Sequence, residues 1–182
     1  MRTYLSIGAV LLFGVTGCQK PETPAQVATR MGQESAAAKT QIQAVARRWE
    51  AWTAGGQADS FPAVFTDQGV ELPPHAPAAV GAAAIKSVHT QQASLGQWTL
   101  HITVDDVTAN GPLAVARGTF ISALAPAPGA PAGIPVADTG KWVGEYHQAD
   151  GTWKTETLIW NSDLPLPMPA PAAVPTKQPA RH

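Results

Sequence analysis

The stretch GKWVGEYHQADGTWKTETLIW, residues 140–160, predicts two β-strands and the turn between them. Asp150-Gly151 is a strong two-residue turn signal, because Asp and Gly tolerate the positive φ that a type I′ hairpin turn requires. The segments on either side, residues 140–148 and 152–160, are therefore expected to pair as an antiparallel hairpin. The C-terminal part of the folded chain is thus predicted to belong to a β-sheet.

Two more strands are predicted before this hairpin. In WTLHITV, residues 98–104, large apolar residues alternate with threonine and histidine, which is typical of a strand with one buried face. LAVARGTFISAL, residues 113–124, is a second strand candidate, and a loop rich in proline and glycine follows it at residues 125–138. The sheet is thus expected to be largely antiparallel.

The residues before these strands have helical periodicity. Residues 36–56 predict an amphipathic helix that ends at two glycines, with one apolar stripe made by Ile42, Val45, Trp49 and Trp52. Ser60 is a plausible N-cap for a short second helix anchored by Phe61 and Phe65, and residues 82–95 predict a third helix. Since the helices come first and the strands last, the predicted class is α+β.

The N-terminus has the composition of a secretory signal. Arg2 supplies positive charge, and YLSIGAVLLFGV, residues 4–15, is too short to span a bilayer as a helix. VTGC, residues 15–18, resembles a bacterial lipobox, which implies a signal peptide at 1–17 and lipidation of Cys18. An ordinary secretory peptide is the alternative. Because Gln19 is not the aspartate that usually retains lipoproteins at the inner membrane, the expected location is the periplasmic side of the outer membrane.

Two polar or proline-rich segments flank the predicted domain. Residues 18–35 comprise the cysteine and a predicted flexible spacer, since QKPETPAQVATRMGQES has no sustained apolar period. Residues 164–182, LPLPMPAPAAVPTKQPARH, are dominated by proline and predict a solvated, disordered tail, with a docking segment as the alternative. The domain itself is expected at residues 36–163.

Composition excludes several functional classes. The 182 residues carry a formal net charge of -1, which gives no electrostatic basis for binding nucleic acid. The single cysteine excludes an intrachain disulfide. His75, His89 and His101 lack metal-ligand spacing, so they are interpreted as ordinary surface or strand histidines. No metal and no cofactor are expected.

Three quoted segments together resemble a known family. ARRWEAWTAGGQADSFPAVFTDQGVELPPHAPAAVGAAAIKSV at 46–88, GPLAVARGTF at 111–120 and TGKWVGEYHQADGTWKTETLIWNSD at 139–163 are similar to SnoaL-like, ketosteroid-isomerase-like domains. The resemblance covers residues 36–163 and is strongest for a branch of unknown function. It implies the cone-shaped nuclear transport factor 2-like fold, in which a curved sheet wraps around helices and leaves a pocket.

The resemblance also argues against isomerase chemistry. The family's isomerases use a tyrosine and two carboxylates, and these three positions correspond here to Trp49, Pro73 and Gly144. None of these residues can transfer a proton. The expectation is therefore that the domain is not an enzyme of this type.

Other residues are candidates for the pocket wall. Arg117 lies within an apolar strand, and Glu145 and Glu156 lie on strands that the hairpin makes neighbours, so each could face a ligand or solvent. Tryptophans could wall an apolar site or simply pack in the core. The candidate ligand-binding set is Trp49, Arg117, Trp142, Glu145, Glu156 and Trp160.

Three functions remain open at this point. The first is non-catalytic binding of a small apolar or amphipathic molecule, which predicts a Trp-lined cavity without a reactive carboxylate pair. The second is a lyase, isomerase or hydrolase that uses a pocket glutamate or histidine. The third is a homodimeric interaction module, which predicts a filled cavity and an exposed apolar patch.

Overall fold

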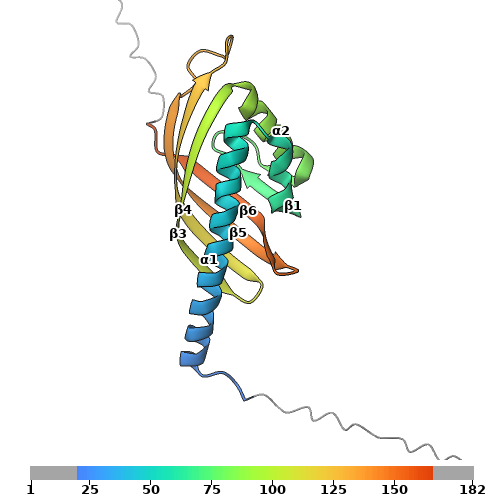
Figure 1. Ribbon diagram of the computed structural model, residues 1–182, viewed down its shortest axis with the longest axis vertical. Helices are drawn as coiled ribbons and strands as arrows, with labels where there is room; N and C mark the ends of the chain where they lie inside the picture. Colours follow the sequence, from blue (N-terminus) through green and yellow to red (C-terminus); the bar gives the residue numbers. More distant parts are fainter. Residues whose placement is uncertain (1–19, 166–182) are drawn as a thin grey trace, which may run out of the picture.

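The computed structural model describes residues 20–165 as one curved sheet wrapped around a long helix (Figure 1). The strand order is β2-β1-β6-β5-β4-β3, and α1 crosses the concave face, with α2 beside one end of it. The elements are α1 Pro24–Gly55, the 3₁₀ helix η1 Ala58–Val64, β1 Phe65–Leu72, β2 Ala79–Val80, α2 Gly81–Ser94, β3 Gly96–Asn110, β4 Leu113–Pro126, β5 Ala137–Ala149 and β6 Thr152–Ser162. The predicted α+β class and cone-shaped fold are confirmed.

The hairpin that joins β5 to β6 forms at the predicted turn. Asp150 and Gly151 have φ values of 50° and 74°, so both adopt the left-handed conformation that this turn needs. Ala149 pairs with Thr152 directly across the turn. The sheet as a whole is mixed, because β1 pairs with β6 in the parallel direction.

Glycines on the inner face of β4 and β5 make room for aromatic rings. A Cβ atom at Gly140 would lie 2.5 Å from the ring of Phe120, and one at Gly144 would lie 2.8 Å from the ring of Tyr146. A Cβ atom at Gly118 would likewise lie 2.8 Å from Nε1 of Trp142. Tyr146 covers a glycine of its own strand, whereas Phe120 and Trp142 each cover the glycine that is their register partner on the neighbouring strand.

The first helix begins earlier than the sequence analysis predicts. Residues 24–35, expected to belong to a flexible spacer, form the first turns of α1. Thr23 and Gln26 form a capping box, in which Thr23 Oγ1 accepts from the amide of Gln26 and Gln26 Oε1 accepts from the amide of Thr23. Pro24 occupies the first helical position, where its missing N–H costs nothing. Thr-Pro-x-Gln was thus a helix-start signal.

The first turns of α1 are held by polar contacts, so they do not need an apolar stripe. Arg30 donates a hydrogen bond to Asn110 Oδ1. The amide of Ala109 donates to Ser35 Oγ, and the amide of Gly111 donates to Glu34 Oε2. These contacts satisfy backbone groups at the edge of β3, the outermost strand of the sheet. The N-terminal part of α1 is therefore held by side-chain hydrogen bonds to the sheet edge.

Two further expectations need correction. The short second element is a 3₁₀ helix whose N-cap is Gln57 rather than Ser60, and Phe65 begins β1 instead of ending a helix. β1 was not predicted, because its glycine and the two prolines that follow it resemble a turn. Residues 1–17, Cys18 and residues 166–182 lie outside the described part. Between residues 20 and 165, no helix is both long and apolar enough to cross a membrane.

Candidate functional site

A cavity of about 240 Å³ lies between α1 and the inner face of the sheet. It is larger than an engineered cavity of about 150 Å³ that holds benzene, and smaller than the roughly 300–1,000 Å³ of pockets for drug-sized ligands. Its wall consists of Ile42, Val45, Ala46, Trp49, Thr53, His89, Gln92, Trp98, Leu100, Ile102, Phe120, Ser122, Ile134, Pro135, Asp138, Trp142, Tyr146, Thr155, Leu158 and Trp160. A one-ring or two-ring molecule matches this volume.

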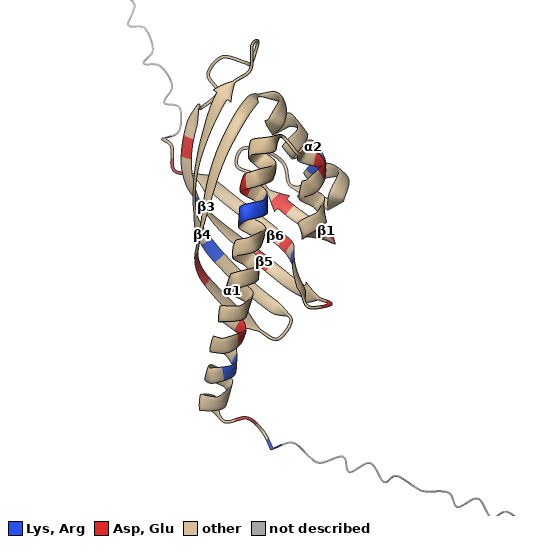
Figure 2. Cartoon of the chain, viewed as in Figure 1, with Lys and Arg blue, Asp and Glu red and all other residues tan. Residues whose placement is uncertain are grey.

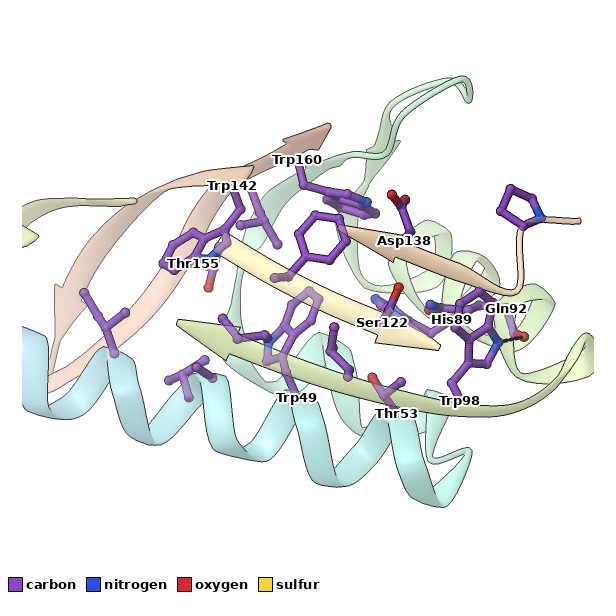
Figure 3. A pocket seen from close by; sticks show the side chains of 18 of the residues that line it. Trp49, Thr53, His89, Gln92, Trp98, Ser122, Asp138, Trp142, Thr155 and Trp160 are labelled. Carbon is purple, nitrogen blue, oxygen red and sulfur yellow. Dashed lines mark hydrogen bonds between the residues drawn. The ribbon is translucent and has the colours of Figure 1, made fainter. Parts of the chain in front are cut away.

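The cavity has an apolar end and a polar end. Figure 3 shows Trp142 and Thr155 at one end, whereas Thr53, Gln92 and Trp98 lie at the other. His89, Ser122 and Asp138 also lie toward this polar end. A ligand with an apolar body and one polar group therefore matches the wall better than a uniformly apolar one.

Three of the predicted tryptophans do line the cavity. Trp49 comes from α1, and Trp142 and Trp160 are register partners on β5 and β6. The indole of Trp142 is fixed by a hydrogen bond from Nε1 to the carbonyl of Thr103, 3.2 Å away. This bond crosses the sheet over Gly118, which explains why that position carries no side chain.

Arg117 and Glu145 do not face the cavity, so these two predictions are wrong. Both lie on the outer face of the sheet, where Arg117 is 3.4 Å from Asp106 and Glu145 is 3.5 Å from His147. The reason is strand parity: Trp142 points inward on β5, and a residue three positions further along must point outward.

Glu156 is also absent from the cavity wall, contrary to prediction. It lies beside a register shift between β5 and β6, and it accepts a 2.7 Å hydrogen bond from Thr66 Oγ1 on β1. Glu156 therefore joins β6 to β1 instead of facing a ligand.

A buried pair that the sequence did not predict, His89 and Glu71, lies beside the cavity: His89 is part of the wall, and Glu71 lies behind it. His89 Nε2 on α2 lies 3.1 Å from Glu71 Oε1 on β1, and the side chains are only 5% and 0% exposed. The imidazole stacks on Phe61, with ring centroids 3.5 Å apart, and meets the edge of Trp49 at 5.3 Å. Aromatic rings thus enclose an ion-pairing contact.

The geometry of this pair falls short of a hydrogen bond. Although the two atoms are within ion-pair distance, none of the four polar side-chain atoms has an aligned hydrogen-bond partner among the described residues. Stacking on Phe61 fixes the plane of the imidazole, so its N–H does not point along the line to the carboxylate. Such an arrangement does not stabilise a fold well, because burying the two groups costs more than an unaligned contact returns.

A pattern in β1 could have indicated Glu71. The family's catalytic base position corresponds to Pro73, just after β1, and Glu71 lies two residues earlier, near the end of the strand. Glu71 pairs in register with Leu158, which also points into the cone. His89 carried a weaker signal, since its spacing from Ile85 places it on the buried face of α2.

The positions of the family's other catalytic groups hold no titrating residue. Trp49 contributes an indole to the wall, and Gly144 is covered by the ring of Tyr146. Burial raises the pKa of the Tyr146 phenol far above its ordinary value, so this hydroxyl stays neutral. Between residues 20 and 165, no group of three or more potential ligands is arranged to hold a metal.

Comparison with known proteins identifies the family. A profile of the SnoaL-like domain matches residues 34–159. The chain belongs to the SnoaL-like family. A search of curated proteins found no match.

Solved structures similar to this SnoaL-like domain share its fold at low sequence identity. A protein of unknown function from Mycobacterium tuberculosis has a TM-score of 0.60 and 19% identity, covering 68% of this chain and 70% of that one. A ketosteroid isomerase-like protein from Erwinia carotovora atroseptica has a TM-score of 0.58 and 18% identity, covering 69% and 96%. An NTF2-like protein with a cystatin-like fold from Novosphingobium aromaticivorans has a TM-score of 0.57 and 15% identity, covering 75% and 88%.

Proposed function

We propose that this SnoaL-like domain binds a small apolar or amphipathic molecule in its cavity without transforming it. The observation that carries the proposal is the unfilled volume of about 240 Å³ inside an aromatic wall. Packed protein interiors leave few voids larger than a water molecule, so an open volume of this size calls for an occupant. The polar groups at one end would orient that occupant.

The sequence supports a location for this binding. The lipobox-like VTGC implies a lipid on Cys18, and several acyl chains would hold the domain firmly at a membrane surface. We propose that the protein is a lipoprotein on the periplasmic side of the outer membrane. Labelling with radioactive palmitate, in the chain and in C18A, tests the anchor: label retained by C18A would contradict it.

The binding proposal is tested with the chain expressed without its first 18 residues, because all the described elements lie within residues 20–165. Native mass spectrometry of this chain, exported to a bacterial periplasm by a cleavable signal peptide without a lipobox and purified from there, would detect a co-purifying small molecule. Isothermal titration calorimetry with naphthylethanol, a two-ring alcohol, provides a defined probe. The expected result is saturable binding at one site, and the same mass spectra report whether the chain is a monomer or a dimer.

A matched pair of substitutions on α1 localises the binding. Ala46 lines the cavity, so Ala46→Phe would fill part of its volume, whereas Ala51→Phe adds the same ring at an exposed position of the same helix. We expect A46F to lower affinity at least about tenfold and A51F to leave it unchanged. Equal affinity in both variants, with thermal unfolding intact, would place the probe elsewhere and overturn the proposal.

The buried His89–Glu71 pair favours a second candidate, an enzyme that transfers a proton at the cavity wall. A carboxylate beside an imidazole can orient the ring and stabilise its charged form, as in many acid–base sites. The discriminating measurement is the fate of the co-purifying molecule. If it is recovered unchanged after incubation with fresh protein, binding is supported, whereas H89Q-sensitive conversion would establish the enzyme.

A further inference from the structure

We infer that the molecule bound in the cavity carries an amine, so that its charged form is an organic ammonium. This inference rests on the proposed function, and it follows from the charges at the polar end of the cavity. Asp138 supplies a carboxylate there, and no lysine or arginine lines the cavity within the described residues.

Asp138 has room for a cationic partner. Its Oδ1 accepts a 2.8 Å hydrogen bond from Ser162 Oγ, and the residue forms no ion pair within residues 20–165. The nearby Lys141 points to the outer face and pairs with Asp163 instead. A half-buried carboxylate without a counter-ion favours a ligand that brings the positive charge.

His89 does not reverse this preference. His89 Nε2 lies 3.1 Å from Glu71 Oε1, so an acidic group already faces its ring. Tyr146 stays a neutral phenol. Charged residues are sparse along the helices and strands that form the cone (Figure 2). Asp138 is the one carboxylate that lines the cavity among the described residues, and since no lysine or arginine lines it, an anionic ligand such as a carboxylate would find no cationic partner there.

The aromatic wall favours the same class. Trp160 lies beside Asp138 (Figure 3), two residues before Ser162 on the same face of β6, and Phe120 lies over Gly140, which follows Asp138 on the inner face of β5. Indole and phenyl faces attract ammonium groups, an interaction that strengthens when water is excluded. A cavity of about 240 Å³ would hold the ring of an arylalkylamine at the apolar end, with the ammonium near Asp138.

Three probes with one ring system and different head groups test this inference: naphthylethylamine, naphthylethanol and naphthylacetate. Calorimetry at neutral pH should give the amine at least about tenfold higher affinity than the alcohol, and the carboxylate the lowest affinity of the three. D138N, which keeps the shape and the Ser162 contact, should bring the amine to within about threefold of the alcohol. D163N makes the same change at an exposed ion pair and should preserve the preference.

The outcomes separate this inference from the proposed function. If the alcohol binds as tightly as the amine, or the carboxylate binds best, the amine inference is wrong while ligand binding stands. An amine preference that survives in D138N would also contradict it, because the charge would then act from another place. If none of the three probes binds, both the inference and the proposed function fail for molecules of this size.

Discussion

Two histidine–glutamate pairs in this molecule have similar separations and opposite surroundings. His89, in the cavity wall, and Glu71, behind it, lie 3.1 Å apart, with side chains 5% and 0% exposed. His147 and Glu145 lie 3.5 Å apart on the outer face of the sheet, with side chains 44% and 49% exposed. The same chemical groups therefore form a buried contact that costs desolvation free energy in one place and a hydrated surface contact in the other.

The separation of two charged groups alone therefore says little about how much an ion pair contributes to stability. At the outer face, water solvates both groups and screens their attraction, so the pair contributes little to stability. At the cavity wall, aromatic rings replace water, and each group depends on the other because no aligned hydrogen bond satisfies either. Removing one member of the buried pair should therefore change stability far more than removing one member of the surface pair.

The largest predicted effect comes from breaking the buried pair. Glu71→Ala should lower the free energy of unfolding by about 3–5 kcal/mol, since it leaves His89 buried without its partner. Urea unfolding followed by tryptophan fluorescence measures this difference. A loss below about 1 kcal/mol would show that the pair is already solvated or relaxed in the native state.

Replacing both members should recover most of that loss. In Glu71→Leu with His89→Phe, apolar side chains of similar size fill the site, and a phenyl ring can keep the stack on Phe61. We expect the double variant to be more stable than E71A by about 2 kcal/mol or more in the same urea experiment. A double variant as unstable as E71A would mean that packing, rather than unpaired polarity, causes the loss.

The strands and helices could be predicted wherever one face is buried and the pattern is regular. The Asp150-Gly151 turn, the alternation in residues 98–104 and the helical stripe through Trp49 all indicate local structure that the fold adopts. β1 could not be predicted in this way, because its pairing with β6 is parallel and joins segments far apart in the chain. Its glycine and the prolines after it resemble a turn.

The candidate site was predictable for its tryptophans and not for its polar groups. Trp142 and Tyr146 share a face of β5 with two glycines, and this period of two already places Glu145 on the other face. The His89–Glu71 contact joins a helix to a strand eighteen positions earlier, and no local pattern specifies that pairing. Asp138 follows a proline-rich loop, and the sequence there does not show which face of the sheet a residue occupies.

A third histidine–glutamate contact separates the effect of an ion pair from that of a hydrogen bond, because its glutamate has a second partner. Glu50 Oε1 lies 3.2 Å from His101 Nδ1 and also accepts a 2.7 Å hydrogen bond from the amide of Ile102 on β3. Glu50→Ala should cost about 1–3 kcal/mol, since it leaves that amide unsatisfied, whereas His101→Ala should cost less than about 0.5 kcal/mol. Thermal unfolding of both variants measures the two effects, and equal losses would assign the stabilisation to the ion pair.

The smallest effect is predicted for the outer-face pair. Glu145→Ala and His147→Ala should each change the free energy of unfolding by less than about 0.5 kcal/mol, because both side chains remain hydrated in the folded chain. Neither change should alter the affinity for naphthylethylamine, since Glu145 points away from the cavity. A weaker affinity in E145A, with unfolding unchanged, would mean that charge on the outer face reaches the ligand through the sheet. The preference for the amine would then depend on the negative charge of the whole sheet and not on the position of Asp138 on the inner face of the same strand.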